Sequence, residues 1–85
     1  MSSSFTIDQI VDCKGMLCPM PIIRLRQALD RVQDGQVIKV LATDPASVQD
    51  MPAFARNTGH ELLESTSSGA GVYEYLFRKT AAESA

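Results

Sequence analysis

Residues 11–26 read VDCKGMLCPMPIIRLR, and this stretch joins a predicted strand to a predicted helix. On its N-terminal side, residues 6–12 have the length and apolar content of a short strand. On its C-terminal side, apolar residues recur at the spacing of one helical face, at Ile22, Leu25, Leu29 and Val32. Cys18 therefore lies where the chain turns and the helix begins.

The residues around Cys18 are typical of a helix start. If Cys18 is the N-cap, Pro19 is the first helical residue and Pro21 is the third. Neither proline then costs a hydrogen bond, because the first four N–H groups of a helix have no intrahelical partner. Pro19 has its φ preset for the helix, and the residue before a proline favours the extended geometry of an N-cap. The two prolines predict a stiff platform for the thiol.

This position predicts a moderately activated nucleophile. A thiolate at a helix N-terminus faces the positive end of the macrodipole, which lowers the pKa of the thiol. The prolines remove two nearby N–H donors, whereas Lys14, Arg24 and Arg26 add positive charge. The alternative interpretation is a buried apolar cysteine at a helix end. The paired prolines and the basic helix favour the nucleophile.

The second cysteine and the single histidine are predicted to be structural. Cys13 and Cys18 lack the C-x-x-C spacing of thioredoxin-like sites, and we expect Cys13 to pack at a strand end rather than act as a resolving thiol. His60 begins a predicted strand, far from both. Cysteine and histidine alone cannot supply the four ligands of a closed zinc site, so we expect no metal.

Length and charge narrow the function. The chain has 85 residues, enough for one domain, expected at residues 6–80 with flexible tails at 1–5 and 81–85. A net charge of −2 predicts no nucleic-acid partner. The local basic group suits an acidic protein surface and consists of Lys14, Arg24, Arg26 and Arg31.

The sequence also predicts a cytoplasmic protein. No apolar run approaches the roughly 18 residues of a membrane span. Residues 1–4 have neither the basic region nor the apolar core of a secretory signal. In the cytoplasm both thiols stay reduced unless catalysis oxidises them.

Two helices and three further strands are expected after the first strand. The first helix should end before Asp34, with Gly35 as its C′ residue. Because Pro52 is costly deep inside a helix, we expect residues 44–49 to form a separate turn and Asp50 to cap the second helix. The first helix is expected at 19–33 and the second at 48–58, or at the part of 48–58 that follows the cap at Asp50. The further strands are expected at 36–43, 60–66 and 72–79.

These elements predict an α/β two-layer sandwich in the order βαβαββ, with two helices on one face of a four-stranded mixed sheet. The first two strands should be parallel, and strand 36–43 should be central because it is almost continuously apolar. The last two strands should form an antiparallel hairpin. Tyr73, Tyr75 and Phe77 share one face, where sheet packing is favoured over base stacking. The open face could serve self-association, so we expect a monomer or weak dimer.

The pattern Asp12-x-x-Gly15-x-x-Cys18-Pro19-x-Pro21 resembles the signature of the TusA/SirA-like sulfur carrier proteins. The resemblance covers residues 7–79 and includes segments 34–36, 43–46, 50–54, 59–62 and 75–79. Members of that family fold as the sandwich predicted above.

The resemblance implies that Cys18 accepts sulfane sulfur as a persulfide and passes it to another protein. It assigns Asp12, Gly15, Pro19 and Pro21 a supporting role and gives Cys13 none. The implied activity is that of a sulfurtransferase that works as a carrier rather than a stand-alone enzyme, without cofactor or metal. The implied donor is a cysteine desulfurase or a rhodanese-like protein. The acceptor is a relay protein in tRNA thiolation, sulfur or thiosulfate metabolism, or molybdenum cofactor synthesis.

Two alternatives remain open on the sequence alone. In the first, the chain is a non-catalytic regulatory or interaction module that docks through the first helix, with Cys18 only structural. The docking residues in either case would be Lys14, Met16, Leu17, Arg24 and Arg26. Met16 and Leu17 would contact a partner if exposed and form a hydrophobic staple if buried. In the second alternative, Cys13 and Cys18 form a redox switch, which needs a suitable Cα distance.

Overall fold

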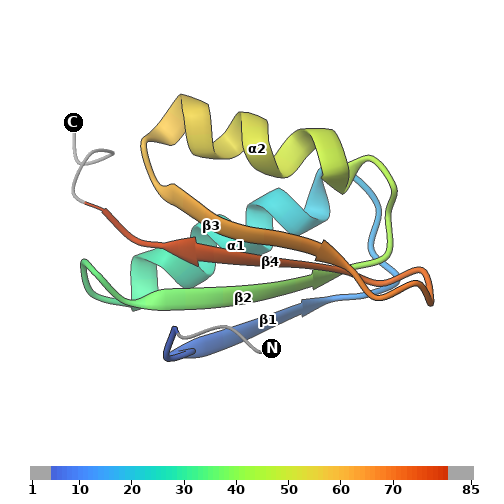
Figure 1. Cartoon of the computed structure of the whole chain (residues 1–85). Helices are drawn as coiled ribbons and strands as arrows, with labels where there is room; N and C mark the ends of the chain where they lie inside the picture. Colours follow the sequence, from blue (N-terminus) through green and yellow to red (C-terminus); the bar gives the residue numbers. More distant parts are fainter. Residues whose placement is uncertain (1–4, 81–85) are drawn as a thin grey trace.

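The computed structural model describes residues 5–80, which contain four strands and two helices (Figure 1). The flexible tails predicted at 1–5 and 81–85 fall, apart from Phe5, outside the described residues. The elements are β1 (Gln9–Cys13), α1 (Met20–Arg31), β2 (Val37–Ala42), α2 (Ser47–Thr58), β3 (Glu61–Ser67) and β4 (Tyr73–Arg78). This order is the predicted βαβαββ, and each strand begins and ends within three residues of its expected position.

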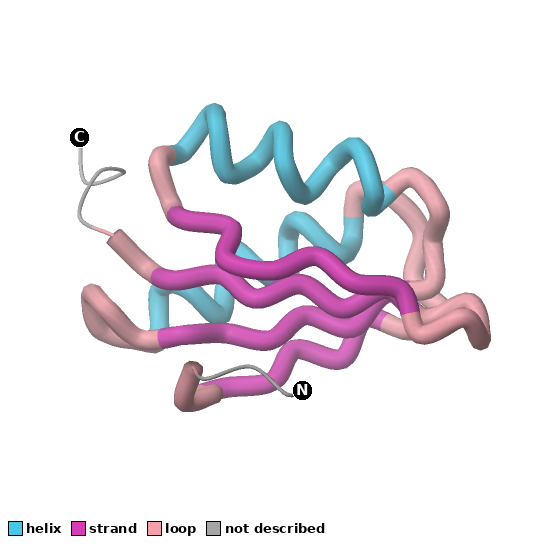
Figure 2. The backbone as a smooth tube through the Cα atoms, in the orientation of Figure 1, coloured by secondary structure: helices cyan, strands magenta, loops and turns pink. Residues whose placement is uncertain are grey.

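Within residues 5–80 the strands form one mixed sheet in the order β1-β2-β4-β3 (Figure 2). β1 runs parallel to β2, whereas β4 is antiparallel to both β2 and β3. The predicted parallel pair, central second strand and C-terminal hairpin are therefore confirmed. α1 packs against β1 and β2, and α2 packs against β3 and β4.

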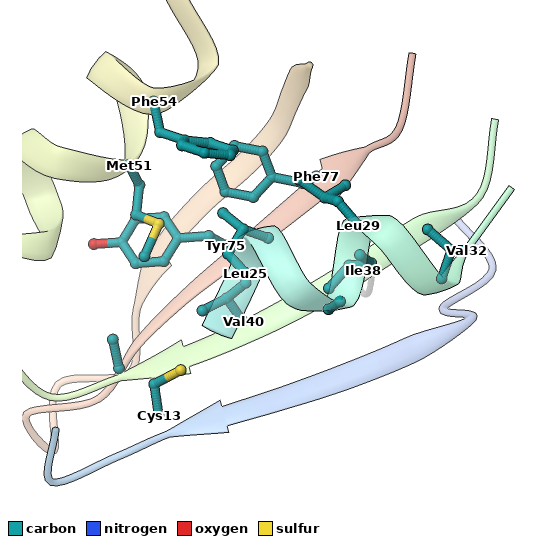
Figure 3. Close-up of a cluster of buried hydrophobic side chains, with 12 residues drawn as sticks. Cys13, Leu25, Leu29, Val32, Ile38, Val40, Met51, Phe54, Tyr75 and Phe77 are labelled. Atoms are coloured by element: carbon teal, nitrogen blue, oxygen red, sulfur yellow. The ribbon is translucent and has the colours of Figure 1, made fainter. Parts of the chain in front are cut away.

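The core lies between the helices and the sheet (Figure 3). Alternate residues of a strand point to the same face, so β4 sends Tyr75 and Phe77 toward the helices. Phe77 meets Phe54 of α2 edge to face, with ring centroids 5.8 Å apart. The predicted packing of Tyr75 and Phe77 in the sheet is confirmed, and Tyr73 is partly buried against the same core. The remaining large contributors to the core are Cys13, Leu25, Leu29, Val32, Ile38, Val40 and Met51.

The start of α1 differs from the prediction by one residue. The first bond of the helical ladder joins the Ile23 N–H to the Pro19 carbonyl at 3.2 Å, so Pro19 is the N-cap. Before it, the Met20 N–H donates to the Leu17 carbonyl at 2.9 Å and closes a separate turn. The prediction that Cys18 is the N-cap is therefore wrong, because Cys18 lies inside this turn.

The end of α1 also differs. Val32 leaves the helix in an extended conformation and buries its side chain in the core, so the helix ends at Arg31. The Val32 carbonyl accepts a hydrogen bond from Lys79 Nζ at 2.9 Å. Gly35, with φ +89°, is not the C′ residue and belongs to a turn closed by the Gln36 N–H and the Gln33 carbonyl.

α2 is one continuous helix that contains Pro52, so the prediction of a separate turn at 44–49 and a cap at Asp50 is wrong. The missing N–H of Pro52 removes one ladder bond, while the buried side chains of Met51 and Phe54 hold the helix on the sheet. The Ser47 hydroxyl adds a buried hydrogen bond to the Tyr75 hydroxyl at 2.7 Å. At the other end, Gly59 adopts φ +86° and its N–H donates to the Ala55 carbonyl, which caps the helix.

Candidate functional site

Cys18 lies on the surface, in the turn between β1 and α1. β1 and β2 are parallel neighbours, so this turn and the turn after β2 emerge at the same end of the sheet (Figure 1). Asp44 joins the two turns. One carboxylate oxygen accepts the Cys18 N–H at 2.9 Å, and the other accepts the Ala46 N–H at 3.0 Å. The backbone at Cys18 is therefore fixed by a residue distant in sequence.

Two of the predicted supporting residues shape the same turn. Gly15 has φ +83°, a conformation that strongly favours glycine, and its N–H donates to Thr43 Oγ1 at 2.8 Å. The Asp12 carboxylate accepts the Lys14 N–H at 3.0 Å, which is a local turn of the kind that Asp side chains often make. Asp12 and Gly15 thus position the chain that carries Cys18 rather than contact its thiol.

The two prolines occupy different surroundings. Pro19 is exposed beside Cys18, and the peptide bond between them is cis. Pro21 is buried in the first turn of α1, where its missing N–H would have had no intrahelical partner. Together they fix the backbone on the C-terminal side of the thiol.

Cys18 opens onto a shallow groove between α1 and α2, with a volume of about 280 Å³. Ile22 and Arg26 of α1 line one side of the groove, and Asp50 and Phe54 of α2 line the other. The Arg26 guanidinium lies 5.3 Å from the centre of the Phe54 ring. The groove brings together the predicted thiol, a predicted docking arginine and residues of the second helix.

The pKa of the Cys18 thiol is shifted in the direction opposite to the prediction. Hydrogen bonding to Asp50, slight desolvation and the charges of Asp50 and Asp44 raise the pKa of the Cys18 thiol above its ordinary value. The prediction of a lowered pKa is therefore wrong, because the carboxylates of Asp50 and Asp44 act on the Cys18 thiol, whereas Arg24 acts on Cys13.

The predicted docking residues do not gather on one face. Lys14, Leu17 and Arg26 are exposed, and Arg26 lines the groove of Cys18, whereas Met16 is half-buried and packs against the core. Arg24 lines a different, polar groove beside β1. At the start of α1, sequence reasoning missed two exposed apolar side chains. The apolar surface there consists of Leu17, Met20 and Ile23, with exposed fractions of 72%, 42% and 39%.

The other cysteine and the histidine have structural surroundings. Cys13 is fully buried, and burial is the largest cause that raises the pKa of its thiol. Both cysteines are free thiols, with Cys13 inside the core and Cys18 at the surface, so the structure does not pair them. His60 is buried, stacks on Phe54, and accepts the Thr80 N–H at Nδ1 at 3.1 Å. The predicted packing of Cys13 at a strand end is confirmed, and the burial of His60 agrees with its predicted structural role.

Sequence reasoning did not find Asp44 and Asp50 as neighbours of the thiol. Both were assigned to turns and caps of the second helix on local grounds. The available signal was topological, because parallel strands place the loops that follow them at one edge of the sheet.

In the part of the chain that the structure describes, neither helix is long and apolar enough to cross a membrane.

Comparison with known proteins identifies similar chains. Residues 9–79 match the family described as Sulfurtransferase TusA. A sulfur carrier protein TusA from Allochromatium vinosum is 47% identical over 73 residues, which cover 86% of this chain and 95% of the relative. A sulfur carrier protein TusA from Pseudomonas putida is 40% identical over 79 residues, with 93% of this chain and 98% of the relative covered.

A solved structure shares the fold. The crystal structure of a SirA-like protein from Desulfitobacterium hafniense matches with a TM-score of 0.75 and 29% sequence identity. The match covers 85% of this chain and 97% of that protein. The two-layer α/β architecture is therefore common to both.

Proposed function

The chain belongs to the TusA family of sulfur carrier proteins, and from this premise we propose that it carries sulfane sulfur as a persulfide on Cys18. A sulfur carrier works in a relay and exchanges sulfur with a donor protein and an acceptor protein. The observation that carries the proposal is the exposed Cys18 thiol, held at the mouth of the groove by the Asp44 anchor on its backbone N–H.

The transfer consists of two thiol exchanges. The Cys18 thiolate attacks the outer sulfur of a persulfide on the donor. A new S–S bond forms at Cys18, the S–S bond of the donor breaks, and the donor cysteine leaves as a thiolate that carries the electron pair. An acceptor thiolate then attacks the outer sulfur on Cys18 and releases Cys18 in the same way. No net oxidation occurs, and both steps depend on the thiolate fraction and on access to the sulfur.

We propose that donor and acceptor dock on the surface around the thiol. Leu17, Met20 and Ile23 supply an exposed apolar contact, and Lys14 and Arg26 add positive charge beside it. Such a surface suits a protein with an apolar centre and an acidic rim. The donor classes that fit are a cysteine desulfurase and a rhodanese-like protein, for tRNA thiolation or sulfur metabolism. The carrier would then act as a sulfurtransferase, and a free thiol of this kind is suited to the cytoplasm.

Sulfur loading tests the proposal. The protein is incubated with a cysteine desulfurase plus cysteine, or with a rhodanese plus thiosulfate, and its intact mass is measured without reductant. We expect a gain of one sulfur atom that reductant reverses. Cys18→Ser should abolish the gain, whereas Cys13→Ala, which removes a buried thiol, should retain it. Loading that survives Cys18→Ser would overturn the proposal.

The alternative of a non-catalytic docking module makes Cys18 a structural residue. The exposure of its side chain speaks against that role. Under the alternative, the wild-type protein would gain no sulfur from any donor while still binding a partner through α1.

A further inference from the structure

A second groove lies between β1 and α1, away from the groove of Cys18. Its volume is about 160 Å³. One wall consists of four consecutive residues of β1, 9–12, and the other consists of Arg24, Gln27, Ala28 and Arg31 of α1. Because one wall is a continuous piece of strand, the groove follows the direction of β1. We call it the β1 groove.

β1 forms one edge of the sheet (Figure 1). Within residues 5–80, β2 is the sole strand that pairs with β1, so the backbone N–H and C=O groups on the outer side of β1 have no strand partner there. Ile10 adds an apolar side chain with an exposed fraction of 60%. An edge that offers backbone groups and an apolar contact is suited to accept one further strand.

The α1 wall of the β1 groove is positively charged. Arg24 and Arg31 lie two helical turns apart on one face of α1, with Gln27 between them. In the described part of the chain, no carboxylate forms a salt bridge with either arginine. The negative charge at the groove is Asp12, whose carboxylate already accepts the Lys14 N–H and lies 4.0 Å from the Lys14 ammonium group. The excess positive charge complements an acidic segment.

We propose that the β1 groove binds an extended acidic segment of the protein that exchanges sulfur with Cys18. The segment adds as a strand to the outer edge of β1, and its carboxylates pair with Arg24 and Arg31. A second copy of this chain fits the groove less well, because a symmetric contact between two β1 edges brings the arginines of both copies together.

This docking rests on the carrier function proposed above and leaves the thiol accessible. Arg24 and Arg26 project from opposite sides of α1, since successive helical residues are about 100° apart. Arg24 lines the β1 groove, whereas Arg26 lines the groove of Cys18. A partner that holds the β1 groove therefore leaves the approach to Cys18 open for its own reactive cysteine.

A titration followed by nuclear magnetic resonance tests the docking. The probe is a short peptide of alternating glutamate and valine with blocked ends, added to the isotope-labelled full-length protein. We expect saturable shifts at the amides of β1 and of the groove-lining residues of α1, and a dissociation constant that rises with salt. Arg24→Gln and Arg31→Gln should each weaken binding several-fold, because each removes one partner of a carboxylate.

Matched controls separate this site from general attraction. Arg56→Gln makes the same charge change at an exposed position in the last turn of α2 and should retain the wild-type affinity. The same peptide with methylated backbone nitrogens keeps its charge but lacks the N–H donors of a strand, so it should bind far more weakly to the wild type. Equal binding of the methylated peptide, no binding of the original peptide, or an equal loss in Arg56→Gln would overturn the proposal.

Two further measurements distinguish other outcomes. Sedimentation of the protein alone reports its oligomeric state, and self-association that shifts the β1 amides would give the groove to a second copy and overturn the proposal. Sulfur loading is followed on separate aliquots. Loading at Cys18 without peptide binding rejects only the docking proposal, whereas peptide binding without loading rejects only the carrier role of Cys18.

Discussion

At the scale of single residues, two different carboxylates hold Cys18. Asp44 accepts a hydrogen bond from the Cys18 backbone N–H, while Asp50 is the largest cause that raises the pKa of the thiol. The first contact fixes the backbone that carries the sulfur atom, and the second influence favours the protonated thiol. The two effects can therefore be separated by substitution, and the residues that shape the turn can be tested apart from those that tune the thiol.

Gly15 provides a prediction for the turn. A side chain at φ +83° is strained by about 1–2 kcal/mol, and no atom lies within 4 Å of the added Cβ, so only the backbone conformation should suffer. We expect Gly15→Ala to lower the free energy of unfolding by about that amount. It should also slow sulfur loading, because the Gly15 N–H anchors the turn to Thr43.

Gly69 is the matched control for that prediction. It has φ +82° and equally open surroundings, in the loop between β3 and β4. Gly69→Ala should cost similar stability in urea unfolding and leave the loading rate unchanged. Equal loading rates in the two alanine variants would show that the shape of the Gly15 turn does not matter to the site.

At the scale of elements, the start of α2 matters most, since it carries Asp50 to the groove. The helix begins at Ser47, whose hydroxyl shares a buried hydrogen bond with Tyr75 of β4. Sequence reasoning placed the start at Asp50 because Pro52 argues against a longer helix. Tertiary contacts outweigh that local cost, with Met51 fully buried and Phe54 packed on Phe77.

The bond between Ser47 and Tyr75 gives a prediction for this element. Ser47→Ala leaves a buried tyrosine hydroxyl without that partner, which should cost about 1–3 kcal/mol of unfolding free energy. Tyr75→Phe in the same chain removes the stranded hydroxyl and should recover part of the loss. Urea unfolding of both single variants and the double variant measures the coupling. Strictly additive losses would contradict the account.

At the scale of the whole molecule, the pKa values of Cys13, Cys18 and Tyr75 are all raised in the described structure. Burial is the largest cause for Cys13 and Tyr75, and the bond to Asp50 is the largest for Cys18. The folded state therefore holds these protons more tightly than the unfolded chain does.

The sign of the pH dependence follows from that difference. The stabilisation is fully present below the ordinary thiol pKa of 9.0 and is lost as pH rises through the higher folded values. We expect the free energy of unfolding, measured in urea, to fall above that pH. Cys13→Ala should make the fall shallower, because it removes one raised group. Stability that holds or rises in alkaline solution would refute the prediction.

The fold was predictable because its signals are local and repeated. Apolar spacing marked Leu25 and Leu29 on one helix face, and alternation marked Tyr75 and Phe77 on one strand face. The thiol was predictable from the paired prolines that follow it. Its carboxylate neighbours were not, because Asp44 and Asp50 reach Cys18 only through the packing of α2 and the side-by-side turns of two parallel strands.

The location of the carried sulfur shows whether Cys18 is the carrier residue. The protein is loaded by a donor, alkylated to trap any persulfide, digested, and sequenced by tandem mass spectrometry. We expect one additional sulfur on the peptide that contains Cys18, between the sulfur of that residue and the alkyl group, with Cys13 unmodified in its buried position. Additional sulfur on Cys13 would contradict the role of Cys18. So would a protein that has gained sulfur while neither cysteine carries it.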